Sequence, residues 1–295
     1  MSKPWILVSP ASRGIGHALT RHLLRTTTAP ILATARSDLP GVRASILDSL
    51  SSSPSTPLSK DEKTSLSKRL HLTHIDVTHE QSLTTASAEA AQLFPPETHH
   101  LHLAFALPGI LHPEKSPADV DYAAALHTLQ VNVLGPLMLI KHFGDFLPRK
   151  NVDISPEPLF TSPPQSPTTP NEDGEANNPP PHATFLLPSA RVGSTTDNRL
   201  GGWYTYRASK AGVTSLARTY DLYLQNRSGG KAICIAYHPG TVKTDLSREF
   251  WDRVRAEKLF TPEYAAERMV EVVRTRRAGE HRGRCWDWRG VEVLP

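Results

Sequence analysis

The sequence is poor in cysteine, in net charge and in long apolar runs. Its two cysteines, Cys234 and Cys285, form neither a disulfide framework nor a metal-ligand spacing, which predicts free thiols in a reducing cytoplasmic compartment. A dispersed formal charge of +4 argues against a nucleic-acid or membrane surface as partner. No apolar stretch is expected to span a bilayer, and the run from Trp5 to Val8 is too short for a secretory signal. These features predict a soluble cytosolic protein.

Histidine is abundant by comparison, with fourteen residues. Three of them, His99, His100 and His102, cluster, but no carboxylate or cysteine stands at ligand spacing from them. We therefore expect no metal site and interpret these histidines as ordinary surface residues.

Compact apolar runs alternate with helix-compatible segments along most of the chain, and 38% hydrophobic residues over 295 positions allow a large core. This alternation predicts an α/β fold with a doubly wound, Rossmann-type parallel sheet in a single domain over residues 1–295. A short last strand is expected over Arg284–Trp288. The main strands are predicted at Trp5–Val8, Ile31–Ala35, Leu70–Ile75, Leu101–Ala106, Ala183–Leu187 and Ala232–Tyr237.

Two segments depart from this alternation. Residues 51–69 are rich in serine, proline and lysine, which predicts a solvated loop. Ten prolines lie between residues 148 and 181, a composition that cannot bury a core. We expect a disordered insert at residues 149–182 within the single domain.

The first strand leads into a glycine turn, SPASRGIG, at residues 9–16, with a helical segment behind it. Such a turn directs backbone N–H groups and the positive end of the helix dipole at one point, where a dinucleotide pyrophosphate can bind. Gly14 and Gly16 allow close approach, although the same pattern also begins helices that bind no ligand. The second strand ends at Arg36, which together with Arg13 offers cations to an adenosine 2′-phosphate and favours NADP over NAD.

The residues that follow the third and fourth predicted strands also point to a ligand site. Asp76 can accept a hydrogen bond from an adenine amino group, and Leu107–Gly109 lies at the carboxyl edge of the sheet, where open α/β sheets hold ligands. Asn132 stands among apolar residues of a helical segment predicted over 119–147. Gly135 and Pro136 would loosen that helix and free a nearby carbonyl to hold a water.

The segment GGWYTYRASKAG, residues 201–212, contains Tyr206 and Lys210 one helical turn apart. A lysine ammonium beside a phenol favours the phenolate and lowers the pKa of the tyrosine. Tyr206 is therefore a candidate general acid, although any surface helix can also carry this pair.

Taken in order, SPASRGIG, ATAR, DV, VNVLG, YRASK and HPGTVKT resemble the short-chain dehydrogenase/reductase family, in particular its C-factor or sniffer-like branch. The resemblance covers nearly the whole chain apart from residues 51–69 and 149–182. It implies an NADP-dependent carbonyl reductase that acts on a small carbonyl or alcohol substrate and assembles as a homo-oligomer. It implies catalytic roles for Tyr206, Lys210 and Asn132, and cofactor contacts from Ser9, Ser12, Arg13, Gly14, Ile15, Gly16, Arg36, Asp76, Val77, Gly109, Asn132, Tyr206, Lys210, Val242 and Thr244.

The sequence departs from the family pattern at three places. Pro10 replaces the first glycine of the turn, and the polar motif after the fourth strand reads Ala-Leu-Pro-Gly at residues 106–109. Ala190 stands where the family has its substrate-orienting serine, so we expect Ser189, or else Ser194, to present a hydroxyl to the substrate. These departures motivate an alternative function, a catalytically silent NADP(H)-binding signalling or scaffold protein.

Overall fold

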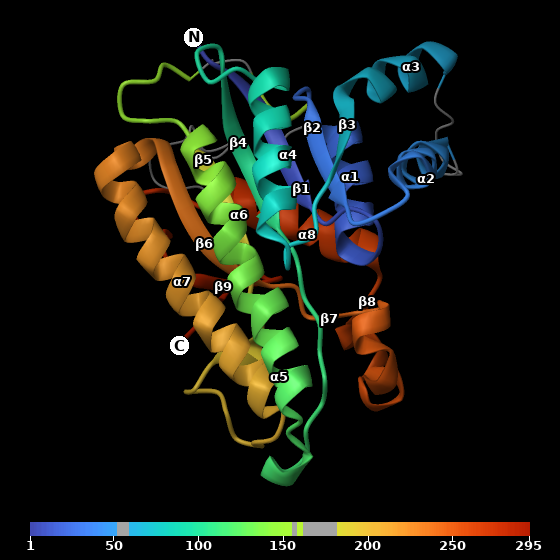
Figure 1. Ribbon diagram of the computed structural model, residues 1–295, viewed down its shortest axis with the longest axis vertical. Coiled ribbons are helices and arrows are strands. Elements are labelled where there is room, and N and C mark those ends of the chain that lie inside the picture. Colours follow the sequence, from blue (N-terminus) through green and yellow to red (C-terminus); the bar gives the residue numbers. More distant parts are fainter. Residues whose placement is uncertain (52–58, 155–157, 162–181) are drawn as a thin grey trace.

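A mostly parallel sheet forms the centre of the protein (Figure 1). The computed structural model describes residues 1–51, 59–154, 158–161 and 182–295. Within these residues the main sheet has eight strands in the order β10-β9-β6-β5-β4-β1-β2-β3, and only β10 runs antiparallel to its neighbour. The strands are β1 (Lys3–Ser9), β2 (Ile31–Ala35), β3 (Leu70–His74), β4 (His99–Ala106), β5 (Ala183–Pro188), β6 (Ala232–His238), β9 (Cys285–Asp287) and β10 (Glu292–Val293).

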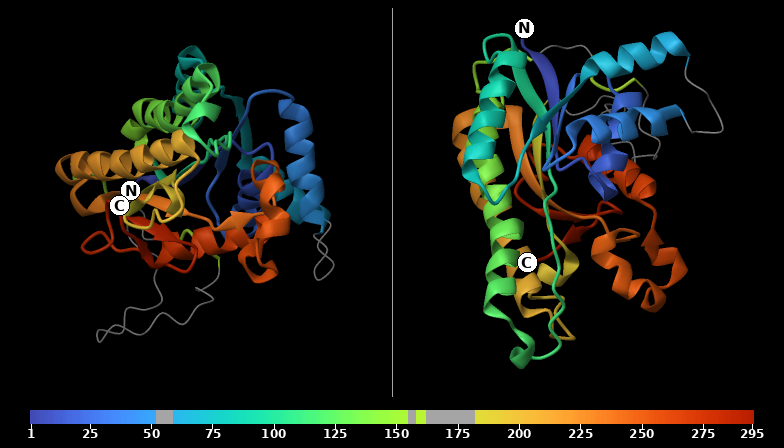
Figure 2. Two further views of the ribbon diagram at one scale, coloured as in Figure 1. Left: turned by 90° about the horizontal axis from the view of Figure 1, so that it is seen from below. Right: turned by 45° about the vertical axis from the view of Figure 1, so that its right-hand side comes forward.

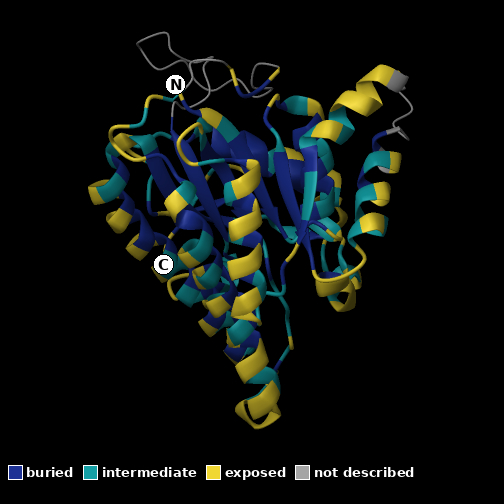
Figure 3. Cartoon of the chain, turned by 45° about the horizontal axis from the view of Figure 1, so that its top comes forward, coloured by how far each residue is buried: buried dark blue, intermediate teal, exposed yellow. Residues whose placement is uncertain are grey.

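The strands are buried, as their apolar composition predicts. The central strands are largely coloured as buried in Figure 3. All five residues of β2 and the last five of β1 are buried. Strand β1 pairs with β2 on one side and with β4 on the other, so the chain reverses its direction across the sheet between β3 and β4. The loops that follow β1 and β4 diverge at this reversal and leave a crevice for a ligand. The predicted doubly wound fold is confirmed.

Helices cover both faces of the sheet (Figure 2). Helices α1 and α8 pack together over one face and share a core with the even-numbered side chains of β1, such as Ile6 and Val8. Helices α4, α6 and α7 cover the other face, where Leu7 belongs to the second core. The helices are α1 (Gly14–Thr26), α2 (Leu39–Ser51), α3 (Lys60–Arg69), α4 (Glu80–Leu93), α5 (Tyr122–Leu129), α6 (Gly135–Phe143), α7 (Tyr204–Ser228) and α8 (Pro262–Thr275).

The expectation of a loop over residues 51–69 is wrong for its second half, which forms helix α3. Ser59 accepts a hydrogen bond from the Glu62 backbone, and the Glu62 carboxylate accepts one from the Ser59 backbone, which makes a capping box. This S-x-x-E signal was present in the sequence, and it outweighs the polar composition. Residues 52–58 lie outside the described part of the chain.

The helix predicted over residues 119–147 is divided in the structure. Helices α5 and α6 are joined by a π-helical turn, Gln130–Leu134, in which the Gly135 N–H bonds to Gln130 O. Pro136 has no N–H to offer to Asn132 O, the carbonyl that an α-helix would pair with position 136. The predicted loosening at Gly135 and Pro136 is therefore confirmed.

This helical run also corrects one expectation about membranes. Residues Tyr122–Phe146 form a 25-residue helical stretch with a mean hydropathy of 1.5, long and apolar enough to cross a membrane by length and composition alone. Leu139 and Phe143 in this stretch are fully buried in the core beside α4. A core helix of a globular protein has the same composition.

Part of the segment predicted as a disordered insert is ordered and buried. Leu159 and Phe160 are only 5% and 7% exposed, and they belong to the core under α1 and α8. Thr28 N donates to Leu159 O, and the Arg274 guanidinium lies 4.4 Å from the centre of the Phe160 ring. The prediction that residues 149–182 cannot contribute to a core is therefore wrong for Leu159 and Phe160, while Pro158 and Thr161 beside them are exposed. Residues 155–157 and 162–181 lie outside the described part.

The prediction that the histidine cluster lies at the surface is wrong for two of its three members. His100 and His102 are buried on β4, at the amino end of the sheet, and their rings are hydrogen-bonded at 3.0 Å. Ser2 Oγ lies 3.0 Å from the other nitrogen of His100. Since β4 lies between β1 and β5, even its polar side chains enter the core. Among the described residues, no group of three or more His, Cys, Asp or Glu side chains is arranged to hold a metal ion.

Candidate functional site

The turn between β1 and α1 is shaped by its glycines. A Cβ at Gly16 would lie 1.9 Å from Pro10 O, so no side chain fits there. Gly14 has φ +56°, in the left-handed region, and begins α1. Arg13 occupies the N-cap position, and its side chain makes no cap hydrogen bond. The arrangement directs the first N–H groups of α1 toward the carboxyl edge of the sheet, where an anion can bind.

Ser9 lies at the start of this turn and is among the residues that line the cavity beside it. It accepts a hydrogen bond of 2.8 Å from Thr34 Oγ1 on β2 and is buried. The Ser9 hydroxyl therefore ties the start of the turn to β2, and its contact with a cofactor stays a prediction.

Two cations and one carboxylate lie around the ends of β2 and β3. Arg36 is exposed at the end of β2, and Arg13 makes a loose ion pair of 3.8 Å with Asp245. Asp76 accepts two hydrogen bonds from Thr78, at 2.9 Å from N and 2.7 Å from Oγ1. Burial raises the pKa of Asp76, but these bonds and the nearby charges of His79 and Arg36 together hold it below its ordinary value. Asp76 is therefore an ionised hydrogen-bond acceptor at neutral pH.

Tyr206 and Lys210 are both buried on α7, 8% and 4% exposed. Lys210 Nζ lies 5.5 Å from the centre of the Tyr206 ring and donates a hydrogen bond of 2.6 Å to Pro188 O at the end of β5. A Cβ at Gly109 would lie 3.8 Å from Lys210 Nζ and 4.0 Å from Asn132 Oδ1. The structure therefore brings together Gly109, Asn132, Tyr206 and Lys210, which are far apart in the sequence.

The predicted effect of Lys210 on Tyr206 does not dominate in this structure. Burial raises the pKa of the Tyr206 phenol, and burial lowers the pKa of the Lys210 ammonium to about 8. Desolvation disfavours both the Tyr206 phenolate and the Lys210 ammonium. Because Lys210 Nζ lies 5.5 Å from the centre of the Tyr206 ring, the attraction between these two charges is weaker than the effect of desolvation. Tyr206 is thus held in its protonated form, which is the form that donates a proton.

Asn132 lies in the π-helical turn and is fully buried. Its side chain accepts a hydrogen bond of 2.8 Å from Ile110 N and donates to Ile110 O at 2.9 Å and to Ser209 Oγ at 3.0 Å. Ser209 Oγ in turn donates to Tyr206 O at 2.7 Å. The Asn132 amide therefore ties the loop after β4 to the turn of α7 that carries Tyr206.

The serines expected to replace Ala190 are engaged elsewhere. Ser189 Oγ donates to Lys210 O at 3.1 Å and lies 2.8 Å from Thr214 Oγ1, both on α7. Ser194 Oγ accepts from Asp197 N at 3.0 Å. In this structure these hydroxyls fix α7 and the loop after β5. Ser189 and Ala190 both line the cavity described below, whereas Ser194 is not among its lining residues. That Ser189 presents its hydroxyl to a substrate stays a prediction.

Val242 and Thr244 follow β6. Val242 lies in the short strand β7 (Thr241–Val242), which pairs with β8 (Leu259–Phe260). Thr244 approaches the glycine turn, since its Cγ2 lies 3.2 Å from the position of a Cβ at Gly14. The loop after β6 thus closes over the turn after β1.

Three residues of the site were not identified from the sequence. Ser209 is one, and buried Glu114 is another, whose carboxylate accepts from Thr205 N at 3.1 Å and anchors the start of α7. The third is His238, whose Nδ1 is buried without a hydrogen-bond partner in the described structure. Burial lowers the pKa of His238 to about 4. Only tertiary contacts reveal the first two, whereas the HPG motif could have singled out His238.

Two adjoining cavities lie at the carboxyl edge of the sheet. One, of about 670 Å³, is lined by the glycine turn, Arg36, Asp76 and Val77. The other, of about 720 Å³, is lined by Tyr206, Lys210 and the loops after β5 and β6. Both are lined by Leu107, Pro108 and Gly109 after β4. Together they form one trough that runs from Arg36 to Tyr206, with the geometry of a Rossmann-type dinucleotide site.

Comparison with known proteins agrees with this architecture. No protein-family model matches the chain. The NADPH-bound carbonyl reductase from chicken fatty liver is similar over the full length of both chains, with 22% identity and a TM-score of 0.73. The carbonyl reductase Sniffer of D. melanogaster is likewise similar over the full length of both chains, with 19% identity and a TM-score of 0.71. The match to the short chain dehydrogenase from Salmonella enterica serovar Typhi covers 98% of this chain and 96% of that protein's chain, with 17% identity and a TM-score of 0.68.

One further relative is matched by sequence. The 1-hydroxy-2-glutathionyl-2-methyl-3-butene dehydrogenase of Rhodococcus sp. (strain AD45) is 25% identical over 199 residues, which are 68% of this chain and 69% of the relative. The chain thus has the fold of the short-chain dehydrogenases/reductases, and the resemblance predicted from its motifs, including the likeness to the sniffer-like branch, is confirmed at that level.

Proposed function

We propose that the protein is an NADP(H)-dependent oxidoreductase of the short-chain dehydrogenase/reductase family. It would transfer hydride between nicotinamide and a carbonyl or alcohol substrate. Cofactor binding and catalysis would both belong to one domain, residues 1–295. The observation that supports this most strongly is the burial of Tyr206 and Lys210 beside Gly109, which lines both cavities. The test is NADPH oxidation by the purified protein with a panel of aldehydes, ketones and quinones, followed by absorbance.

The trough fits NADP(H). The space left by Gly14 and Gly16 at the start of α1 suits the pyrophosphate, which Ser12, Arg13 and Ile15 would also line. Arg36 and Arg13 would receive the 2′-phosphate, and Asp76 and Val77 the adenine. The nicotinamide end would lie against Gly109, Asn132, Tyr206, Lys210, Val242 and Thr244.

In the reductive direction the cofactor, when bound, supplies the hydride. As the carbonyl carbon accepts it, negative charge develops on the carbonyl oxygen, and the Tyr206 phenol donates its proton there to complete the alcohol. The Lys210 ammonium stabilises the phenolate that remains. The Asn132 carbonyl, which has no helical partner at Pro136, would hold a water that returns a proton to Tyr206.

Arg36→Ala should weaken NADPH binding selectively. Each charge-assisted hydrogen bond to a phosphate contributes roughly 1.5–3 kcal/mol, so we expect the Kd for NADPH to rise about tenfold to a hundredfold. The Kd for NADH, which has no 2′-phosphate, should change little. Fluorescence titration with both cofactors measures this.

Arg255→Ala is the matched control, because Arg255 is exposed and lines neither cavity. Equal losses for NADPH and NADH in Arg36→Ala would contradict the assignment of Arg36 to the 2′-phosphate.

The alternative function, NADP(H) binding without catalysis, has one observation in its favour. Ala190 lines the cavity, and the Ser189 hydroxyl is bonded to α7, so Tyr206 would act without the family's serine. Loss of one oxyanion donor costs roughly 2.7–4 kcal/mol, which slows catalysis but does not abolish it. Tight NADPH binding with no turnover over the whole carbonyl panel would favour the alternative.

We also propose that the protein self-associates through α5 and α6. Five apolar side chains are exposed along this surface, more than a solvated helix face needs: Tyr122, Leu126, Leu129, Leu134 and Leu137. Leu126→Glu together with Leu137→Glu should convert a dimer or tetramer to a monomer in sedimentation. A wild-type protein that sediments as a monomer at micromolar concentration would contradict this proposal.

A further inference from the structure

The cavity beside Tyr206 is unusually cationic for an otherwise nearly neutral chain. Its charged lining residues are Arg191, Arg199, Arg207, Lys210 and a single carboxylate, Asp197. Arg191 and Arg199 lie on the segment between β5 and α7, and Arg207 lies in the first turn of α7. Whether each charge is available to a molecule in this cavity depends on the carboxylates around it.

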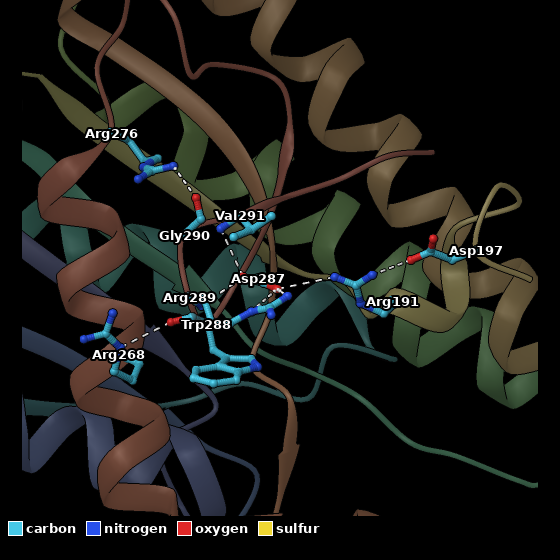
Figure 4. Close-up of polar contacts among 9 residues, drawn as sticks. All are labelled: Arg191, Asp197, Arg268, Arg276, Asp287, Trp288, Arg289, Gly290 and Val291. Carbon is cyan, nitrogen blue, oxygen red and sulfur yellow. Dashed lines mark hydrogen bonds and ion pairs between the residues drawn. The ribbon is translucent and has the colours of Figure 1, made fainter. Parts of the chain in front are cut away.

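Arg191 does not contribute a free charge. Its guanidinium lies 2.6 Å from Asp197 and 3.4 Å from buried Asp287, so two carboxylates face it (Figure 4). Asp287 also accepts from Arg289 and from Val291 N in the turn after β9. The network neutralises Arg191 and fastens the loop after β5 to the C-terminal turn.

Arg207 retains its charge. Its half-buried guanidinium donates to Gly202 O at 2.9 Å, to Gly201 O at 3.0 Å and to Val192 O at 3.1 Å. Carbonyls hold the side chain in place but do not cancel its charge, and no carboxylate lies within ion-pair distance of it in the described structure. A fixed and partly desolvated cation of this kind favours an anionic neighbour.

Arg199 is exposed on the segment between β5 and α7 and lines the same cavity. It forms no hydrogen bond or ion pair within the described residues. With Arg207 it leaves two uncancelled positive charges on one wall.

The remaining lining is apolar and aromatic. The Trp203 ring lies edge-on to the Tyr206 ring with centroids 6.1 Å apart, and it contacts Phe250 at 4.9 Å. Leu246 and Val254 extend this surface. A flat apolar body would therefore pack beside the Tyr206 phenol.

We propose that the substrate of this site is a flat, apolar carbonyl compound with a carboxylate or similar anion remote from the carbonyl, and that Arg199 and Arg207 receive that anion. The proposal rests on the proposed function, because the carbonyl must lie beside Tyr206. Reduction consumes one hydride from NADPH and one proton and yields the corresponding alcohol and NADP.

A matched substrate pair tests the proposal. The probes are 4-formylbenzoate and its methyl ester, which differ in charge but hardly in shape. We expect kcat/KM to favour the carboxylate by about tenfold at low salt, and the preference to shrink at higher ionic strength as the charges are screened. A wild-type enzyme that uses the ester equally well or better would overturn the proposal.

Variants locate the effect. Arg199→Ala should remove most of the carboxylate preference by raising the KM for 4-formylbenzoate. The kcat/KM for the methyl ester and the KM for NADPH should stay unchanged. Arg255→Ala makes the same charge change outside the cavity and should leave kcat/KM unchanged for both substrates. A preference that survives in Arg199→Ala and in Arg199→Glu would overturn the role of Arg199.

A binding measurement separates this proposal from the proposed function. Calorimetry with 4-carboxybenzyl alcohol and its methyl ester, in the presence of NADP, reports charge preference without any turnover. Stronger binding of the carboxylate supports the inference, and equal binding overturns it. Failure to reduce either aldehyde counts against the reductase function alone.

Discussion

Tyr206→Phe should lower carbonyl reduction by roughly 10²–10⁴-fold while NADPH binding and stability stay unchanged. The Tyr206 hydroxyl makes no hydrogen bond within the described residues, so its removal leaves no group unpaired. The ring keeps its contact with Trp203, at 6.1 Å between centroids, so the packing at the start of α7 is preserved. The loss should appear in kcat and in kcat/KM alike, because the proton is needed only as charge develops on the substrate oxygen.

Tyr204→Phe is the matched control, because Tyr204 stands two residues away on α7 and is 43% exposed. It should retain full activity. A Tyr206→Phe enzyme that binds NADPH and turns over at the wild-type rate would remove Tyr206 from the mechanism.

Acid should destabilise the protein steeply, through its buried histidines. Burial lowers the pKa of His102 to about 3 and of His100 and His182 to about 4, against an ordinary value of 6.5. Below pH 6.5 the unfolded chain therefore binds protons that the folded protein excludes. These histidines therefore do not lower the free energy of unfolding above about pH 6.5. As the pH falls from there toward about 4, the free energy of unfolding drops by up to roughly 1.4 kcal/mol per histidine per pH unit.

Three such residues acting together would remove about 4 kcal/mol per pH unit, a large part of a typical total stability of about 5–15 kcal/mol. Urea unfolding at a series of pH values from about 7.5 down to about 5 measures this slope. His102→Leu should flatten it, whereas His74→Asn, at an exposed position, should not. A free energy of unfolding that does not change over this range would contradict the assignment of these histidines as buried and neutral.

Most of the architecture could be predicted from the sequence, because it depends on local patterns. The apolar runs ending at Val8, Ala35 and Ala106 each became a strand, since a parallel strand buried on both faces needs a continuous apolar run. Thr261 and Pro262 begin α8 as expected, with Thr261 accepting from Tyr264 N at 3.2 Å. Helix α3 was not predicted, although the S-x-x-E pattern of its capping box is present in the sequence.

The details of the site could not be predicted, because they depend on contacts between distant residues. Whether Ser189 faces a substrate depends on Thr214, twenty-five positions later, which draws its hydroxyl toward α7. The pKa values of Tyr206 and Lys210 depend on burial, which their spacing on a helix does not reveal. Leu159 and Phe160 enter the core in spite of a proline-rich surrounding, since a few apolar residues suffice to fill a gap beside α1 and α8.

The central claim is that Tyr206 and Lys210 stand where a nicotinamide cofactor reacts. A crystal structure of the protein with NADPH tests it most directly. We predict nicotinamide and its ribose against Tyr206 and Lys210, and the adenosine 2′-phosphate against Arg36. NADPH bound outside the trough, or bound in it with its adenosine end at Tyr206, would contradict the account.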